Sequence, residues 1–223
     1  MGSKICTLEE ICEDYKIVLL DNSVILQSFD SCLRHHYTQD KIRLLRDQFK
    51  SISFWKPYFI KYSNIYLIPE VLKELDCRAV ENKKIKYKKR KGKEQERYGL
   101  PFKEFTINLN IYLKRKKDLL KLIKKTDSII QLTDSEKEKI KHLFNTCEYL
   151  KNQEKQLSDV DYSIIINGIC LSQTRGKTVI LSNDGGIFYA WRDSVKKYLF
   201  LREKLDFCFR QERNSFNVIT CFK

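Results

Sequence analysis

The chain has 223 residues and a formal net charge of +14, because 43 lysines and arginines outnumber 29 aspartates and glutamates. Its 42% hydrophobic and 12% aromatic content excludes a disordered basic tail, and only 7 glycines and 3 prolines exclude collagen-like and linker sequences. We expect residues 1–223 to form one domain with a sizeable core. The positive charge favours a polyanionic partner.

The cysteines do not have the spacing of a structural zinc site, since no pair has two to four intervening residues. We expect most of them to be small apolar residues in a reducing compartment, with the cytoplasm as the location. The N-terminus lacks the apolar core of a signal peptide, and no apolar run approaches the roughly 20 residues of a membrane span. The eight positions are Cys6, Cys12, Cys32, Cys77, Cys147, Cys170, Cys208 and Cys221.

The first third of the chain predicts two strand–helix units. Residues 16–20 are a short apolar run that predicts a buried strand, followed by a helix for which Ser23 is the expected N-cap. Residues 38–62 predict a helix with a continuation broken at Pro57. Residues 64–68 repeat the strand pattern before a helix with proline at its first position and acid in its first turn.

The middle of the chain is strongly basic. Eight of the eleven residues at 83–93 are basic, which predicts an exposed insertion or arm at about 82–104. Residues 106–125 predict an amphipathic helix with a basic polar face.

The second half continues the alternation of strands and helices. A deeply buried helix is expected at 162–172, capped by residues 157–161 and ended by Arg175-Gly176. The whole pattern predicts an α/β fold, three-layer α/β/α with a central, mostly parallel sheet. The remaining expected strands are 128–132, 177–181 and 216–221, and the remaining helices begin near Thr133 and after the turn 182–186.

Carboxylates follow three of the predicted strands. Asp21 comes directly after the first, Asp184 lies in the turn after residue 181, and Glu74 is one helical turn beyond Pro69. Asp161 begins the buried helix, with Asp159 two residues before it. Functional groups gather at the carboxyl ends of strands in such sheets, so we expect these acids to converge.

Clustered acids repel one another unless cations neutralise them, and oxygen-rich clusters suit Mg²⁺ and Mn²⁺. One or two such ions can activate a water and clamp both the attacking and the leaving oxygen of a phosphodiester. Acidic side chains that bind a metal ion, surrounded by basic side chains that bind a polyanion, are typical of a nuclease.

Four short motifs occur in order, at residues 20–24 (Leu-Asp-Asn-Ser-Val), 68–75 (Ile-Pro-Glu-Val-Leu-Lys-Glu-Leu), 158–161 (Ser-Asp-Val-Asp) and 181–184 (Leu-Ser-Asn-Asp). Together they resemble the PIN domains, a group of metal-dependent ribonucleases and related nucleases. The resemblance covers about residues 15–223 and implies a PIN-like nuclease domain enlarged by the basic segment. It also implies a catalytic, metal-binding quartet and two supporting hydroxyls. The quartet is Asp21, Glu74, Asp161 and Asp184, and the hydroxyls are Ser23 and Ser182.

Two positions have competing residues. Glu70 competes with Glu74, although acid in a first helical turn also complements the helix dipole. Asp159 competes with Asp161, because either is suited to be the N-cap while the other reaches a metal, and Asp159 is a candidate fifth acid. The family pattern favours Glu74 and Asp161.

The basic segment and the adjacent basic helix are expected to neutralise nucleic-acid phosphates. A solvated charge run or a localisation signal is the alternative for residues 83–93. The expected nucleic-acid-binding residues are Lys83, Lys84, Lys86, Lys88, Lys89, Arg90, Lys91, Lys93, Lys114 and Arg115.

The implied function is a Mg²⁺- or Mn²⁺-dependent endoribonuclease, in RNA processing or decay or as the toxin of a toxin–antitoxin pair. RNA is the expected partner; an antitoxin, another protein or a second copy of the chain are further candidates, and no membrane association is expected. The alternatives are a non-catalytic RNA-binding scaffold with a PIN-like fold and a structure-specific DNA nuclease.

Overall fold

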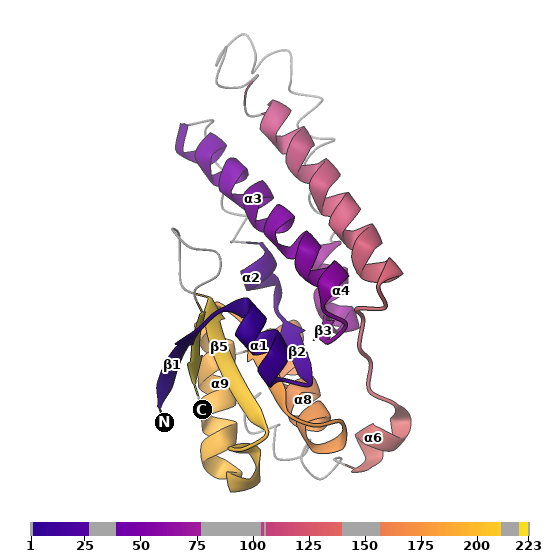
Figure 1. The fold of residues 1–223 in the computed structure, drawn as a ribbon, viewed down its shortest axis with the longest axis vertical. Coiled ribbons are helices and arrows are strands. Elements are labelled where there is room, and N and C mark those ends of the chain that lie inside the picture. Colours follow the sequence, from indigo (N-terminus) through magenta and orange to yellow (C-terminus); the bar gives the residue numbers. More distant parts are fainter. Residues whose placement is uncertain are drawn as a thin grey trace.

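The structure, a computed structural model, describes residues 2–26, 39–76, 104, 106–139, 157–210 and 219–222, with the backbone alone at 39–49, 139 and 210 (Figure 1). The fold is α/β, as predicted. The basic segment at 82–104 lies outside the described residues except for Glu104, and so do all its predicted nucleic-acid-binding residues.

A mixed six-stranded sheet forms the centre, with the order β1-β6-β5-β4-β2-β3. The pairs β2–β3, β2–β4 and β4–β5 are parallel, whereas β1–β6 and β5–β6 are antiparallel. All residues of β2 and β4 are buried, which explains why every residue of β2 and the last three residues of β4 are apolar. The strands are β1 (Ser3–Cys6), β2 (Ile17–Leu20), β3 (Ile65–Tyr66), β4 (Thr178–Leu181), β5 (Leu205–Arg210) and β6 (Ile219–Phe222).

Helices α8 and α9 pack against each other and against β5, and α8 also packs against β4. Gly168 allows α8 to approach the sheet, because a Cβ there would lie 2.7 Å from Cδ1 of Ile180. The described helices are α1 (Leu8–Asp14), α2 (Asn22–Ile25), α3 (Gln39–Lys61), α4 (Pro69–Leu75), residues 106–125, α6 (Asp134–Lys139), α8 (Asp159–Thr174), α9 (Gly185–Lys197) and the 3₁₀ turn Leu199–Leu201.

Helix α3 and the helix at 106–125 lie side by side at the end of the molecule away from α6 (Figure 1), and Arg115 donates a hydrogen bond to Ser53 between them. The indole N–H of the fully buried Trp55 donates to the carbonyl of Val24 at 3.0 Å, which ties α3 to α2. The chain after residues 106–125 then runs beside β3, where the amide and carbonyl of Leu67 bond to Ser128 and Ile130 at 2.9 Å. These contacts hold the helical pair against one edge of the sheet.

Two predicted elements differ in form. Residues 39–61 are one continuous helix with Pro57 inside it, so the predicted break is wrong. The buried Trp55 and Phe59 on either side of Pro57 anchor this stretch, and their packing outweighs the hydrogen bond that proline cannot donate. The predicted strand at 128–132 is reduced to an isolated bridge between Leu67 and Ile129.

Three elements were not predicted: β1, α1 and β5. A local signal for α1 is present, because Thr7 and Glu10 form a capping box in which the Thr7 side chain accepts from the Glu10 amide at 3.2 Å. The strand β1 has no such signal, since Ser3, Lys4 and Ile5 are all exposed and only the pairing with β6 makes it a strand.

The described cysteines include one disulfide, which the expectation of a reducing compartment did not anticipate. Cys208 and Cys221 lie directly opposite each other in β5 and β6 and form a buried disulfide. Cys6, Cys12 and Cys170 are buried and form no disulfide, as expected of small apolar residues. Within the described ranges, no helix is long and apolar enough to cross a membrane.

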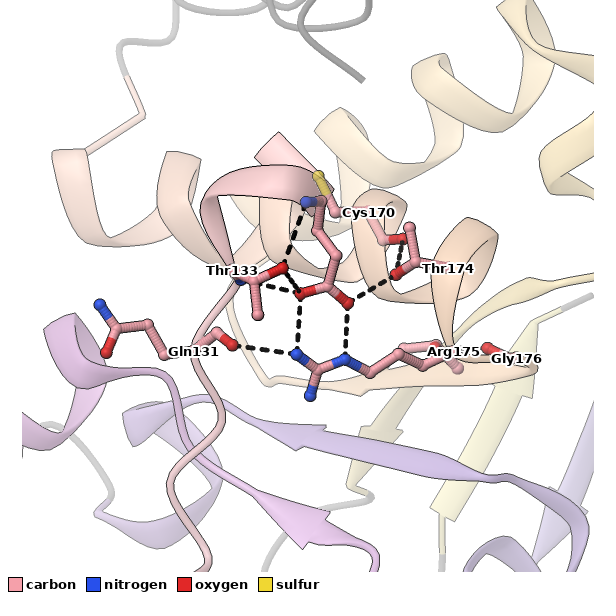
Figure 2. Close-up of polar contacts among 8 residues, drawn as sticks. Gln131, Thr133, Cys170, Thr174, Arg175 and Gly176 are labelled. Atoms are coloured by element: carbon pink, nitrogen blue, oxygen red, sulfur yellow. Dashed lines mark hydrogen bonds and ion pairs between the residues drawn. The ribbon is translucent and has the colours of Figure 1, made fainter. Parts of the chain in front are cut away.

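A polar cluster fastens α6 to the end of α8 (Figure 2). Arg175 donates two hydrogen bonds to the Glu136 carboxylate, at 2.7 and 2.8 Å, and one to the carbonyl of Gln131 at 3.1 Å. Thr174 and Thr133 also donate to Glu136.

The hydrogen bonds from Arg175 are the main cause that lowers the pKa of Glu136 from 4.5 to about 2. The chain then reverses at Gly176, whose φ of 122° favours glycine.

Candidate functional site

Asp21 lies at the carboxyl end of β2 and is only 4% exposed. It is the N-cap of α2, so the prediction that Ser23 has this role is wrong. The Asp21 carboxylate accepts hydrogen bonds from the amides of Asn22 at 2.7 Å and Ser23 at 3.2 Å, and from the Ser23 hydroxyl. The turn that begins α2 therefore fixes the orientation of this carboxylate.

Ser182, at the carboxyl end of β4, joins the two strand ends. Its fully buried hydroxyl donates to Oδ2 of Asp21 at 2.8 Å and accepts from the amide of Asp184 at 2.9 Å. The Ser23 hydroxyl accepts from the amide of Asn183 at 2.8 Å and lies 3.2 Å from the Ser182 hydroxyl. The two predicted supporting serines thus contact Asp21 and each other.

Asp184 is the N-cap of α9. Its Oδ1 accepts hydrogen bonds from the amides of Gly186 at 2.6 Å and Ile187 at 3.2 Å. A Cβ on Gly186 would lie 2.9 Å from the same oxygen, so glycine permits the close approach. The cap uses Oδ1 of Asp184, and no described residue donates a hydrogen bond to its Oδ2.

Asp161 lies in the first turn of α8, where Ser158 is the N-cap, so neither Asp159 nor Asp161 has that role. Ser158 and Asp161 form a capping box in which Oδ2 of Asp161 accepts from the Ser158 amide at 3.2 Å. Burial raises the pKa of Asp161 despite the Ser158 hydrogen bonds, and the charges of Asp184 and Asp21 raise it further. The charges of Asp184 and Asp21 thus act on Asp161. Asp159, the competing acid, is exposed.

Glu74, the fourth predicted acid, is exposed on α4 and is linked to the site through Asn22. The Nδ2 of Asn22 donates to Oε2 of Glu74 at 2.6 Å and to the carbonyl of Val71 at 3.3 Å. Of the two competing glutamates, it is Glu74 and not Glu70 that accepts this hydrogen bond from Asn22. Sequence reasoning missed Asn22, although an amide directly after Asp21 at a strand end was a signal for it.

The chemistry of the donors fits Mg²⁺ or Mn²⁺, which prefer carboxylate and carbonyl oxygens. Asn22 contributes a buried Oδ1 that has no hydrogen-bond partner in the described part of the chain. However, no three acidic, histidine or cysteine side chains in these segments lie close enough together to hold an ion. The donor types fit a hard cation, while a closed set of three ligands is not formed.

The helix at 106–125 carries the described part of the predicted basic surface. Lys114 and Arg115 are exposed, whereas Lys116 is buried on the opposite side. Exposed lysines recur at helical spacing and define the lysine stripe: Lys114, Lys117, Lys121 and Lys125. On the same helix, Nζ of Lys124 lies 3.9 Å from Asp76, two residues beyond Glu74. The stripe and Glu74 therefore lie on neighbouring elements.

Neither a protein-family model, nor a curated protein, nor a solved structure matches this chain.

Proposed function

We propose that this protein is a PIN-like endoribonuclease that uses Mg²⁺ or Mn²⁺ to hydrolyse RNA phosphodiester bonds. The observation that carries the proposal is the bond between Ser182 after β4 and Asp21 after β2, because it joins two of the four motifs across neighbouring strand ends. The raised pKa of Asp161 supports it, since Asp184 and Asp21 both contribute. The proposal includes the three-layer, mostly parallel PIN-like fold, for which the parallel pairing of β3, β2, β4 and β5 is the support.

In this proposal Asp21, Glu74, Asp161 and Asp184 hold the cation. A cation bound by these residues would supply activation of the attacking water and neutralisation of charge at the phosphate. Ser23 and Ser182 keep the Asp21 carboxylate in one orientation, and the α9 cap does the same for Asp184. The lysine stripe binds the phosphates of the RNA backbone.

The test is cleavage of labelled RNA, single-stranded and hairpin, by purified protein with Mn²⁺, with EDTA, and with DNA of the same sequence. We expect Mn²⁺-dependent cleavage of RNA that Asp21→Asn abolishes. The matched control is Asp193→Asn on α9, because Asp193 pairs with Arg192 and has no contact with the site acids in the described structure. Cleavage that survives Asp21→Asn would contradict the proposal, and a preference for DNA would identify the structure-specific DNA nuclease instead.

The second candidate is a non-catalytic RNA-binding scaffold with the same fold. It is favoured by one observation, that no three acids in the described segments lie close enough together to hold an ion. A scaffold should bind RNA through the lysine stripe but should show no Mn²⁺ binding that depends on Asp21. Titration calorimetry with Mn²⁺ on the wild-type protein and on Asp21→Asn separates the two.

The biological setting is proposed as cytoplasmic RNA processing or decay, or as the toxin of a toxin–antitoxin pair. The Cys208–Cys221 disulfide weakens the argument for a reducing compartment. Co-purification of a small inhibitory protein from the native source would favour the toxin role.

A further inference from the structure

We propose that Asn22 is the positioning residue that holds Glu74 in the metal site; this inference rests on the proposed function. Asn22 directly follows Asp21, and its Nδ2 donates to Oε2 of Glu74 at 2.6 Å across 52 residues of sequence. It is the described hydrogen bond that connects Glu74 to the turn containing Asp21. Without it, an exposed glutamate on the surface of α4 would populate several rotamers.

The amide of Asn22 has one orientation that suits its surroundings. Both described acceptors of its Nδ2 are oxygens on α4, the Glu74 carboxylate and the Val71 carbonyl. A flipped amide would point its carbonyl at these two oxygens and lose both bonds. The observed orientation therefore follows from the position of Glu74.

This orientation has an energetic consequence. The Oδ1 of Asn22 is buried and accepts no hydrogen bond from the described residues. Leaving a buried acceptor unsatisfied is unfavourable, so the gain from the two bonds of Nδ2 is offset by the unsatisfied oxygen. A side chain of this kind contributes little net stability to the fold. Buried polar atoms without a hydrogen bond are an exception in folded proteins, and such exceptions occur chiefly at functional sites.

A positioning role and a structural role of the Asn22 hydrogen bonds lead to different experimental results. A structural hydrogen bond would stabilise the fold and would leave metal binding unaffected unless the fold changed. A positioning bond would leave the fold stable and weaken metal binding, because Glu74 would have to be ordered when the ion binds. Residues that orient metal ligands typically change affinity by one to two orders of magnitude when they are removed.

The experiment is calorimetric titration of the full-length protein with Mn²⁺ alone, with thermal unfolding measured on the same samples. For Asn22→Ala we expect a dissociation constant roughly tenfold higher and an unfolding midpoint within about 2 °C of wild type. The matched control is Asn167→Ala, because Asn167 uses its Nδ2 for a bond of 2.8 Å to the Ser163 carbonyl within α8. We expect Asn167→Ala to leave Mn²⁺ affinity unchanged.

A double-mutant cycle with Glu74→Gln tests the route of the effect. If Asn22 acts through Glu74, Asn22→Ala should not weaken Mn²⁺ binding further in the Glu74→Gln background. An additional loss in that background, an unchanged affinity in the single variant, or parallel losses of affinity and stability would each overturn the proposal. Failure of the proposed function is distinguishable, since the wild-type protein would then show no Mn²⁺ binding that Asp21→Asn removes.

Discussion

The hydroxyl of Ser182 donates to Oδ2 of Asp21 at 2.8 Å, and this bond joins positions 161 residues apart at the ends of β4 and β2. Both side chains are buried, so water does not replace the bond readily when it is lost. Ser182 also accepts from the amide of Asp184. One hydroxyl therefore connects two of the four predicted metal ligands.

We expect Ser182→Ala to lower the free energy of unfolding by roughly 1–3 kcal/mol, because Asp21 and the Asp184 amide both lose a buried partner. Mn²⁺-dependent RNA cleavage should fall at least about tenfold, since the ligand is no longer oriented. Urea unfolding and cleavage rates measure the two effects. Ser172→Ala is the control, because the buried Ser172 hydroxyl donates only locally, to Ile169 at 2.7 Å, and its removal should leave cleavage intact.

The lysine stripe should determine how RNA binding depends on salt. We expect replacement of Lys114, Lys117, Lys121 and Lys125 by glutamine to weaken RNA binding and to reduce the slope of log affinity against log salt by up to about 3. Fluorescence anisotropy at several salt concentrations measures this slope. The same charge change at the exposed residues Lys196, Lys197, Arg202 and Lys204 is the control; an equal effect there would mean that the stripe is not a specific surface.

The Glu136–Arg175 contact should make stability depend on pH. The pKa of Glu136 is lowered from 4.5 to about 2, so its contribution is complete above about pH 4.5 and is lost as the pH falls through about 2. At pH 7 we expect Glu136→Gln to cost on the order of 2 kcal/mol, a value reduced for solvent around the partly exposed Arg175.

Urea unfolding at several pH values tests this contact. The difference between wild type and Glu136→Gln should shrink between pH 4.5 and 2, while Glu203→Gln, at an exposed position, should show no such convergence. If the difference in the free energy of unfolding did not change with pH, the ionised Glu136 carboxylate would not be the source of the stabilisation.

Reduction of Cys208–Cys221 should destabilise the β5–β6 edge of the sheet. The bond spans a sequence separation of 13, and closing a loop of this size is worth about 3 kcal/mol. We expect a dithiol reductant to lower the free energy of unfolding by about this amount in the wild-type protein. It should have no effect on the variant with Cys208→Ala and Cys221→Ala; equal sensitivity of the two proteins would show that the disulfide is absent in solution.

Much of the fold follows from local sequence patterns. The apolar runs of β2 and β4 and the proline at the start of α4 predicted these elements near their observed positions. Each pattern acts among near neighbours, through burial on both faces or through a residue's own backbone preference. The break predicted at Pro57 failed because packing of the distant core outweighed that local preference.

By itself, the sequence determined the α/β class and which acids follow β2 and β4, because those features depend on residues a few positions apart. Tertiary structure alone decided that β1 exists and that β6 pairs with β1 and β5 in antiparallel directions. It also decided that Cys208 faces Cys221 and that Asn22 donates a hydrogen bond to Glu74. Strand register and bonds between distant segments depend on how the whole chain packs. The physical reason is that a local pattern carries no information about which of many distant groups will become its neighbour.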